Sequence, residues 1–359
     1  MFKAVGQFIT TTQFYLYGRQ HFTRTGWENS VRSYEVPDIL QDPQLNLTSK
    51  VYMITGANSG IGKEISKFFA SKGATVYMVC RNKERAIAAQ NELVHATNNQ
   101  NIHVLLGDCS LEKDVRRIWN EFSMHQQSQV DSNVCKRDAL SSSSSNSVNI
   151  RLDALICNAG ALGKTKTLTE EGVEVTFGAH LLFGTYLLGK LALPTLVKTP
   201  DSRLIVVSSG GMLNTKFPSW EVATCSGDTS FDGQLAYAYA KRGQVLLCEK
   251  WAEQYAGVPV VVSCHPGWTG TEGVEAAYGS SKSYLEPLRS LWQGSEGIIW
   301  LALADCDKIK SGEFYLDRKP QRKHLSGPFF TEGSFTKNTP QEVDIMMNQL
   351  EKWSLGDRT

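Results

Sequence analysis

The feature that most constrains the fold is a regular alternation of short apolar runs with helical segments, which begins after Lys50. The apolar runs are VYMIT (51–55), ATVYMVC (74–80), NIHVLLG (101–107), LDALIC (152–157), RLIVVS (203–208), VPVVVSC (258–264) and GEFYLD (312–317). Apolar strands that alternate with helices form a parallel sheet with helices on both faces. The sequence therefore predicts an α/β protein, a single domain with a doubly wound parallel sheet of about seven strands.

Three segments lie outside this alternation. Residues 1–46 form an N-terminal extension, residues 124–150 form an insertion, and residues 321–359 form a polar tail with one more helix near 340–353. The insertion is polar and contains five consecutive serines, a composition that is typical of a disordered surface loop. We therefore expect a central domain over residues 47–320 that carries a disordered insert between the extension and the tail.

The N-terminal extension has an unusual charge pattern. Its first 27 residues include Lys3, Arg19 and Arg24 but no acidic residue, and several apolar side chains lie near one helical stripe. This pattern predicts a helix that either docks on the domain or makes a peripheral contact with a membrane surface. An organelle-targeting peptide has a similar composition, so a mitochondrial location is an alternative to the cytoplasmic one.

The composition excludes several classes of function. The net charge is +1 and no long block of Lys and Arg is present, which argues against a nucleic-acid partner. The eight cysteines show neither C-x-x-C motifs nor the Cys/His spacing of a metal site, and several lie in apolar runs. They indicate buried, reduced thiols in a reducing compartment. Without a run of about 18 apolar residues, we expect no transmembrane helix.

A Gly-rich segment, TGANSGIG (Thr55–Gly62), joins the first apolar run to the first helix. Glycines allow a sharp turn and a close approach to a pyrophosphate, and the N–H groups at the start of a helix bind anions. The spacing G-x-x-x-G-x-G differs from the general dinucleotide fingerprint, but its place between a buried strand and a helix predicts a dinucleotide site. The expected cofactor contacts in this segment are Gly56, Asn58, Ser59, Gly60, Ile61 and Gly62.

The ends of the next two apolar runs suggest which cofactor binds. Arg81 follows the second run, where an acidic residue would bind a ribose 2′-hydroxyl and an arginine can pair with a 2′-phosphate. This predicts NADP(H) in preference to NAD(H), with a solvated surface charge as the alternative for Arg81. Asp108 ends the third run and either contacts the adenine amine or caps a helix, a role for which Ser110 competes.

The segment LAYAYAKRG (235–243) places two tyrosines ahead of a lysine. Residues four apart share a face of an α-helix, whereas residues two apart point away from each other. Lys241 therefore lies beside Tyr237, and we expect Tyr239 to pack in the core or in an interface. A phenol has a pKa of about 10, which a nearby ammonium lowers. Tyr237 is thus the candidate general acid/base for a carbonyl or alcohol oxygen.

Five segments occur in the order and spacing of short-chain dehydrogenases/reductases. They are TGANSGIG, CNAG (157–160), VVSSGG (206–211), YAYAK (237–241) and HPG (265–267). Over about residues 50–320 the chain resembles this family. The resemblance implies a Rossmann-type domain, a nicotinamide cofactor, hydride transfer at a carbonyl or alcohol carbon, and a homodimer that forms through two long helices.

The resemblance also implies roles for single residues. Ser209 would hydrogen-bond the substrate oxygen, whereas Ser208 points to the other side of the strand. Further cofactor contacts are implied at Asn158, Ala159, Gly160, Tyr237, Lys241, Pro266, Gly267 and Thr271. The candidate substrate walls, residues 212–234 and 268–290, contain several large apolar side chains, which suggests an apolar substrate.

One residue of the family pattern is absent. Members of the family carry an Asn that holds a water for proton relay, in the helix after the fourth strand. Here that helix reads FGAHLLFGTYLL (177–188). Counting from Gly172 places His180 at the Asn position, whereas counting back from Gly184 places Leu181 there. Imidazole can bind water, so His180 is a candidate relay group, with a structural role as the alternative.

Two classes of function follow from these observations. The first is an NADP(H)-dependent oxidoreductase acting on a small carbonyl or alcohol compound, with Tyr237 as acid/base, Lys241 tuning it and Ser209 binding the oxygen. The second is a nucleotide-binding scaffold or sensor with weak or lost catalysis, because the relay Asn is absent. A hydrolase acting through Ser209 is disfavoured, since SSGG is not a G-x-S-x-G nucleophile elbow.

Overall fold

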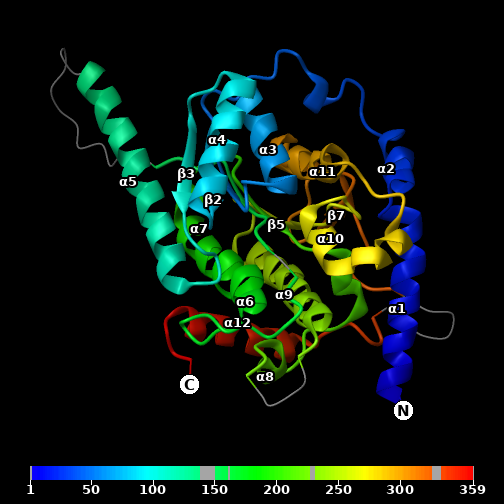
Figure 1. The fold of residues 1–359 in the computed structure, drawn as a ribbon. Helices are drawn as coiled ribbons and strands as arrows, with labels where there is room; N and C mark the ends of the chain where they lie inside the picture. The colour runs from blue at the N-terminus through cyan, green and yellow to red at the C-terminus, as the bar shows by residue number, and fades with distance from the viewer. Residues whose placement is uncertain (1, 138–149, 161, 227–230, 326–332, 359) are drawn as a thin grey trace.

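The computed structural model describes residues 2–137, 150–160, 162–226, 231–325 and 333–358 (Figure 1). Within these residues, an eight-stranded sheet runs in the order β3-β2-β1-β4-β5-β6-β7-β8, parallel except for the antiparallel pair β7 and β8. The strands are β1 (Val51–Thr55), β2 (Thr75–Cys80), β3 (Ile102–Leu106), β4 (Ala154–Cys157), β5 (Arg203–Val207), β6 (Val260–Cys264), β7 (Phe314–Leu316) and β8 (Lys319–Pro320). The predicted doubly wound sheet of about seven strands is confirmed, and β8 adds a short edge.

Helices cover both faces of the sheet. On one face lie α3 (Gly60–Ser71), α4 (Lys83–Thr97) and α11 (Leu291–Leu303). On the other face lie α5 (Glu112–Arg137), α6 (Val175–Phe177), η2 (Gly178–Leu187), α7 (Leu188–Lys198) and α9 (Gly233–Gln254). The remaining helical segments are α1 (Phe2–His21), α2 (Arg24–Val31), η1 (Ile39–Gln41), η3 (Gly210–Asn214), α8 (Trp220–Ala223), α10 (Glu272–Tyr278), η4 (Gly279–Leu285), η5 (Cys306–Lys308) and α12 (Pro340–Ser354).

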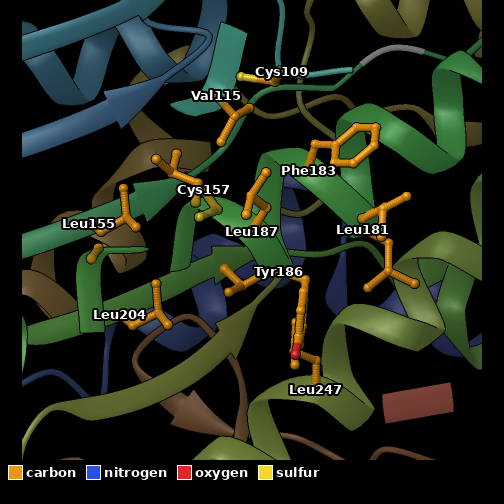
Figure 2. Close-up of a cluster of buried hydrophobic side chains, with 14 of the residues drawn as sticks. Cys109, Val115, Leu155, Cys157, Leu181, Phe183, Tyr186, Leu187, Leu204 and Leu247 are labelled. Atoms are coloured by element: carbon orange, nitrogen blue, oxygen red, sulfur yellow. The ribbon is translucent and has the colours of Figure 1, made fainter. Parts of the chain in front are cut away.

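The sheet separates two apolar clusters. Met53 of β1 belongs to the cluster under α5, η2 and α9, whereas its neighbour Ile54 belongs to the cluster under α3 and α11. Successive side chains of a strand point to opposite faces, so a strand covered on both faces is apolar throughout. Figure 2 shows part of the first cluster, where Leu155 and Leu204 lie with Leu187 and Leu247.

Both ends of the chain pack on the central domain. α1 lies at one edge of the molecule (Figure 1), and its own side chains Thr10 and Phe14 are buried against the rest of the protein. The predicted helix near 340–353 is α12, which begins at a capping box formed by Thr339 and Glu342. α12 packs against η2, and its Glu351 accepts hydrogen bonds from Tyr186 and Lys190.

The expectation of a disordered loop from residue 124 is wrong for its first part. α5 continues without a break to Arg137 and projects beyond the sheet (Figure 1). Many polar residues are good helix formers, so the polar composition of this stretch did not exclude a helix. The serine run lies within residues 138–149, outside the described residues.

The segment after β4 contains a π-helix between two α-helical segments. η2 spans ten residues, and the hydroxyl of Thr185 donates to the carbonyl of His180, five positions earlier, at 2.6 Å. A Cβ added at Gly184 would overlap the carbonyl oxygen of Ala179, also five positions earlier. A π-helix has more residues per turn than an α-helix and is rare outside functional sites. Gly184 is therefore required by the wide turn.

The same segment is strongly apolar. Among the described residues, one helical segment, Val175–Lys198, is long enough and apolar enough to cross a membrane, judged by length and composition alone. Most of this segment is buried inside the protein, where its Leu and Phe side chains form the centre of the first apolar cluster (Figure 2). Its composition is thus explained by its place in the core.

Replacing Gly184 by Ala tests the π-helix without reference to activity. We expect Gly184→Ala to lower the free energy of unfolding by about 2 kcal/mol or more, because the methyl group has no room beside the Ala179 carbonyl. Gly273→Ala in α10 is the control, since its Cβ would meet only the Thr271 hydroxyl, at 3.7 Å. Urea unfolding of both variants measures the difference, and equal stabilities would contradict the close packing of Gly184 on the Ala179 carbonyl.

Candidate active site

The carboxyl ends of β1 and β4 meet at the centre of the sheet, where the strand order reverses. The hydroxyl of Thr55 accepts hydrogen bonds from the backbone N–H groups of Asn158 and Ala159, at 2.9 and 2.8 Å. The Asn158 amide donates to the Thr55 carbonyl, also at 2.9 Å. Ligands of open α/β sheets bind in the crevice at such a switch point. Asn158 and Ala159 therefore shape the crevice from its floor.

The Gly-rich turn follows β1 at this crevice. Gly56 has a positive φ of 67°, and a Cβ there would lie 3.0 Å from the Cα of Ala159. A Cβ at Gly62 would overlap the Gly56 carbonyl, so the turn must pack closely on itself. Gly60 also has a positive φ, but its surroundings are open, the nearest atom being a methyl of Thr271 at 3.7 Å.

The start of α3 suits a bound anion. Ser59 is its N-cap residue, and its side chain makes no capping hydrogen bond. The first-turn N–H groups of a helix need a partner, and a phosphate is a good one because the helix dipole also favours negative charge. The open space at Gly60 and the start of α3 without a side-chain cap therefore fit the pyrophosphate of a dinucleotide. Asn58 and Ile61 lie in the same turn.

Arg81 and Asp108 lie side by side at the ends of β2 and β3. Their side chains form an ion pair of 3.3 Å, and the Arg81 side chain is 70% exposed. Asp108 also accepts hydrogen bonds from the N–H and hydroxyl of Ser110. It does not cap α5, because the N–H of Glu112 at the start of that helix donates to Glu171 instead. Arg81 is thus accessible at the crevice but already has an anionic partner.

Tyr237 and Lys241 lie one helical turn apart on α9. The Lys241 ammonium is 5.4 Å from the centre of the Tyr237 ring and donates to the carbonyl of Val207 at 2.8 Å. Burial lowers the pKa of Lys241 to about 7, and the nearby thiols of Cys157 and Cys264 oppose this only weakly. Tyr239, two positions along the helix, is only partly buried and has Asp232 as a charged neighbour, so it is not part of the buried core. Tyr237 and Lys241 thus share a face of α9, as their spacing in the sequence predicted.

Ser209 lies at the phenol of Tyr237. A Cβ added at Gly211 would lie 3.5 Å from the Ser209 hydroxyl and 3.8 Å from Cε1 of Tyr237. Burial raises the pKa of Tyr237, and a hydrogen bond with Ser209 opposes this rise. Lys241 does not lower the pKa of Tyr237 in the protein without cofactor, where burial dominates that pKa. Ser208 donates instead to the Lys241 carbonyl at 2.8 Å, away from the phenol.

His180 also lies against Tyr237. The two rings meet edge to face, with centres 5.1 Å apart and planes at 88°. A Cβ at Gly160 would overlap the imidazole, so the glycine of CNAG makes room for His180. Leu181 instead points into the core, against Gly243. Of the two residues that counting placed at the Asn position, His180 is therefore the one beside Tyr237.

Comparison with known proteins decides the family. The chain is 35% identical over 342 residues to Dehydrogenase/reductase SDR family member 12 of Bos taurus, an alignment that covers 93% of this chain and 94% of that protein. The human protein of the same name gives 35% over 337 residues with the same coverage. The short chain dehydrogenase family model matches residues 50–136. The chain belongs to the short-chain dehydrogenase/reductase family.

More distant relatives agree with this assignment. Retinol dehydrogenase 11 of Homo sapiens is 29% identical over 279 residues, which covers 76% of this chain and 79% of that protein. A short-chain dehydrogenase structure from Escherichia coli CFT073, complexed with NADPH, has a TM-score of 0.54 at 21% identity. It covers 76% of this chain and 98% of that one, and it supports the fold. As a short-chain dehydrogenase/reductase, this chain is an NAD(P)-linked oxidoreductase of alcohol and carbonyl groups.

The HPG loop of this short-chain dehydrogenase/reductase is held by a residue that the motifs did not reveal. A Cβ at Gly267 would overlap the guanidinium of Arg289, which is buried and pairs with Asp317. Thr271, at the end of the loop, reaches the open space at Gly60. Pro266 begins the loop and accepts a hydrogen bond from the Thr269 hydroxyl at 2.9 Å. No local sequence pattern marked Arg289, because its partner Asp317 lies 28 positions later in the chain.

The expected apolar substrate wall is only partly where the sequence suggested. Met212, Leu213 and Trp268 are buried in a third apolar cluster together with Phe14 and Phe22 of the N-terminal extension. These side chains therefore pack beneath the extension and do not argue for an apolar substrate.

Proposed function

We propose that this chain is an NADP(H)-dependent oxidoreductase that interconverts a carbonyl and an alcohol on a small molecule, with Tyr237 as general acid/base. The observation that carries the proposal is the meeting of three groups at Tyr237: the Ser209 hydroxyl beside its ring, His180 by ring contact and Lys241 on the same helix face. Such a group of polar side chains around a partly buried tyrosine, at the switch point of the sheet, is a site for proton transfer.

The cofactor would be held by groups at the same crevice. The N–H groups at the start of α3 would bind its pyrophosphate, and Arg81 would leave Asp108 to pair with a 2′-phosphate. Lys241 would hydrogen-bond the ribose nearest the nicotinamide. When bound, the cofactor supplies or accepts the hydride, and the protein supplies position and proton.

The protonation of Tyr237 suits carbonyl reduction. Because burial raises the pKa of the phenol, its oxygen carries a proton at neutral pH in the protein alone. The phenol O–H would donate that proton to the substrate oxygen while the Ser209 hydroxyl donates a hydrogen bond to the same oxygen. In the oxidative direction, the Lys241 ammonium and the positive charge of an oxidised cofactor would favour the phenolate.

His180 is the proposed relay group in place of the absent Asn. Its ring lies beside the Tyr237 phenol, and its carbonyl accepts a hydrogen bond from Gln244 at 2.7 Å, which fixes the backbone of the π-helix. An imidazole at this point could hold a water and return a proton to the Tyr237 oxygen after each turnover.

Tyr237→Phe tests the proposed acid, and Tyr239→Phe is its matched control two residues away. We expect Tyr237→Phe to reduce kcat for NADPH-dependent reduction of retinal or aromatic ketones by about 100-fold or more, the usual contribution of a general acid. Tyr239→Phe should stay within about twofold of wild type, because it faces away from Lys241. Tight NADPH binding without turnover on any carbonyl would favour the scaffold or sensor instead.

Arg81→Gln tests the cofactor preference. Wild-type protein should bind NADPH at least about tenfold more tightly than NADH, and the variant should lose this difference, since a charge-assisted pair with a phosphate is lost. Arg85→Gln is the control: Arg85 is exposed and pairs with Glu272. Isothermal titration with both cofactors gives the ratio. Equal affinities in the wild type would overturn the preference for NADP(H).

A further inference from the structure

α1 contacts two loops that flank the candidate active site. One is η3, the turn that begins directly after Ser209, and α1 packs along it. The other is the loop 266–271, which follows β6 and reaches the Gly-rich turn. Although α1 lies outside the sheet, at the edge of the molecule in Figure 1, it joins these two loops.

Contacts to η3 occur at both of its ends. The Thr10 hydroxyl of α1 donates to the carbonyl of Asn214, the last residue of η3, at 3.2 Å. At the other end, a Cβ added to Gly210 would lie 2.5 Å from the Phe22 ring and 2.9 Å from Nε2 of His265. Phe22 therefore packs directly on the residue that follows Ser209.

Contacts to the loop 266–271 come from the same part of the chain. The backbone N–H of Trp268 donates to the Phe22 carbonyl at 2.7 Å, and the two aromatic rings meet edge to face. The Phe22 ring also meets the imidazole of His265, with centres 4.3 Å apart. At Gly18, one turn earlier, a Cβ would overlap the Trp268 ring, so a glycine is favoured there.

Arg289 binds both the end of α1 and the loop 266–271. Its guanidinium donates to the carbonyls of His21 and Phe22, at 2.7 and 2.9 Å, and pairs with Asp317. Its backbone exchanges hydrogen bonds with Trp268 and Gly270 in the loop. The end of α1 and the loop 266–271 are thus bound to the same buried arginine.

We propose that Phe22 is a positioning residue of the active site. It holds the turn after Ser209 and the loop 266–271 at a fixed separation. The N-terminal extension is therefore required for productive binding of cofactor and substrate. The proposal rests on the function proposed above. A displacement of about 1 Å in a catalytic group can lower the rate by two orders of magnitude. The Phe22 ring packs on Gly210, the residue that follows Ser209 in the chain.

Removal of the ring should loosen both loops together. In Phe22→Ala, hydrogen exchange followed by mass spectrometry should show faster exchange in peptides that cover 209–214 and 266–271. The dissociation constant for NADPH should rise, and kcat should fall about tenfold or more at a temperature well below unfolding. Phe22→Leu, which keeps most of the packing but loses the flat ring, should show the same pattern to a smaller degree, and it serves if Phe22→Ala does not fold.

Leu40→Ala is the matched control. Leu40 is a buried apolar residue in the same extension, but it belongs to the cluster beneath α11, away from both loops. It should lower the melting temperature without changing exchange in the two loops or kcat. If Phe22→Ala lowers the melting temperature while exchange, NADPH affinity and kcat stay at wild-type values, Phe22 only contributes to stability and the proposal is wrong.

The exchange measurement keeps this proposal separate from the proposed function. If Tyr237→Phe remains fully active, the assignment of the acid fails, but the exchange of the two loops in Phe22→Ala still reports whether Phe22 holds them. If Tyr237→Phe is inactive and the loops exchange normally in Phe22→Ala, the enzyme proposal stands and the positioning role fails.

Discussion

The contact between the imidazole of His180 and the phenol of Tyr237 depends on the backbone more than on the two side chains. Both His180 and Leu181 lie in the π-helix, where His180 contacts Tyr237 and Leu181 packs in the core. The contact also requires two glycines, Gly184 inside the turn and Gly160 opposite the ring, because a methyl group at either position would overlap a neighbour. The proposed proton transfer therefore depends on a local departure from regular helix geometry.

The two ends of the chain stabilise this arrangement from different sides. Glu351 of α12 accepts hydrogen bonds from Tyr186 and Lys190, and so holds the far end of the π-helix. At the other end of the chain, Phe22 packs on the turn after Ser209. The carbonyls of His21 and Phe22 accept hydrogen bonds from the Arg289 guanidinium, which anchors this end of the chain beside the loop 266–271. Segments that look like additions to a central domain thus pack against its candidate site. Long-range contacts of this kind carry no local sequence pattern.

Much of the fold and part of the site could be predicted from the sequence, for identifiable physical reasons. Apolar runs marked the strands because both faces of the sheet are covered, and the helical period paired Lys241 with Tyr237 and not with Tyr239. The length of α5 was missed because polar residues suit a helix and a loop alike. The π-helix could not be predicted, because the sequence FGAHLLFGTYLL suits a regular buried helix equally well. Phe22 and Arg289 required the tertiary structure.

We propose that His180, which contacts Tyr237 from the π-helix, takes the place of the absent relay Asn. The most direct test compares kcat of His180→Asn and His180→Leu, with NADPH affinity measured in parallel. If the claim holds, the Asn variant keeps kcat within about threefold of wild type and the Leu variant loses about tenfold or more, both with unchanged NADPH affinity. A Leu variant with wild-type kcat would contradict it.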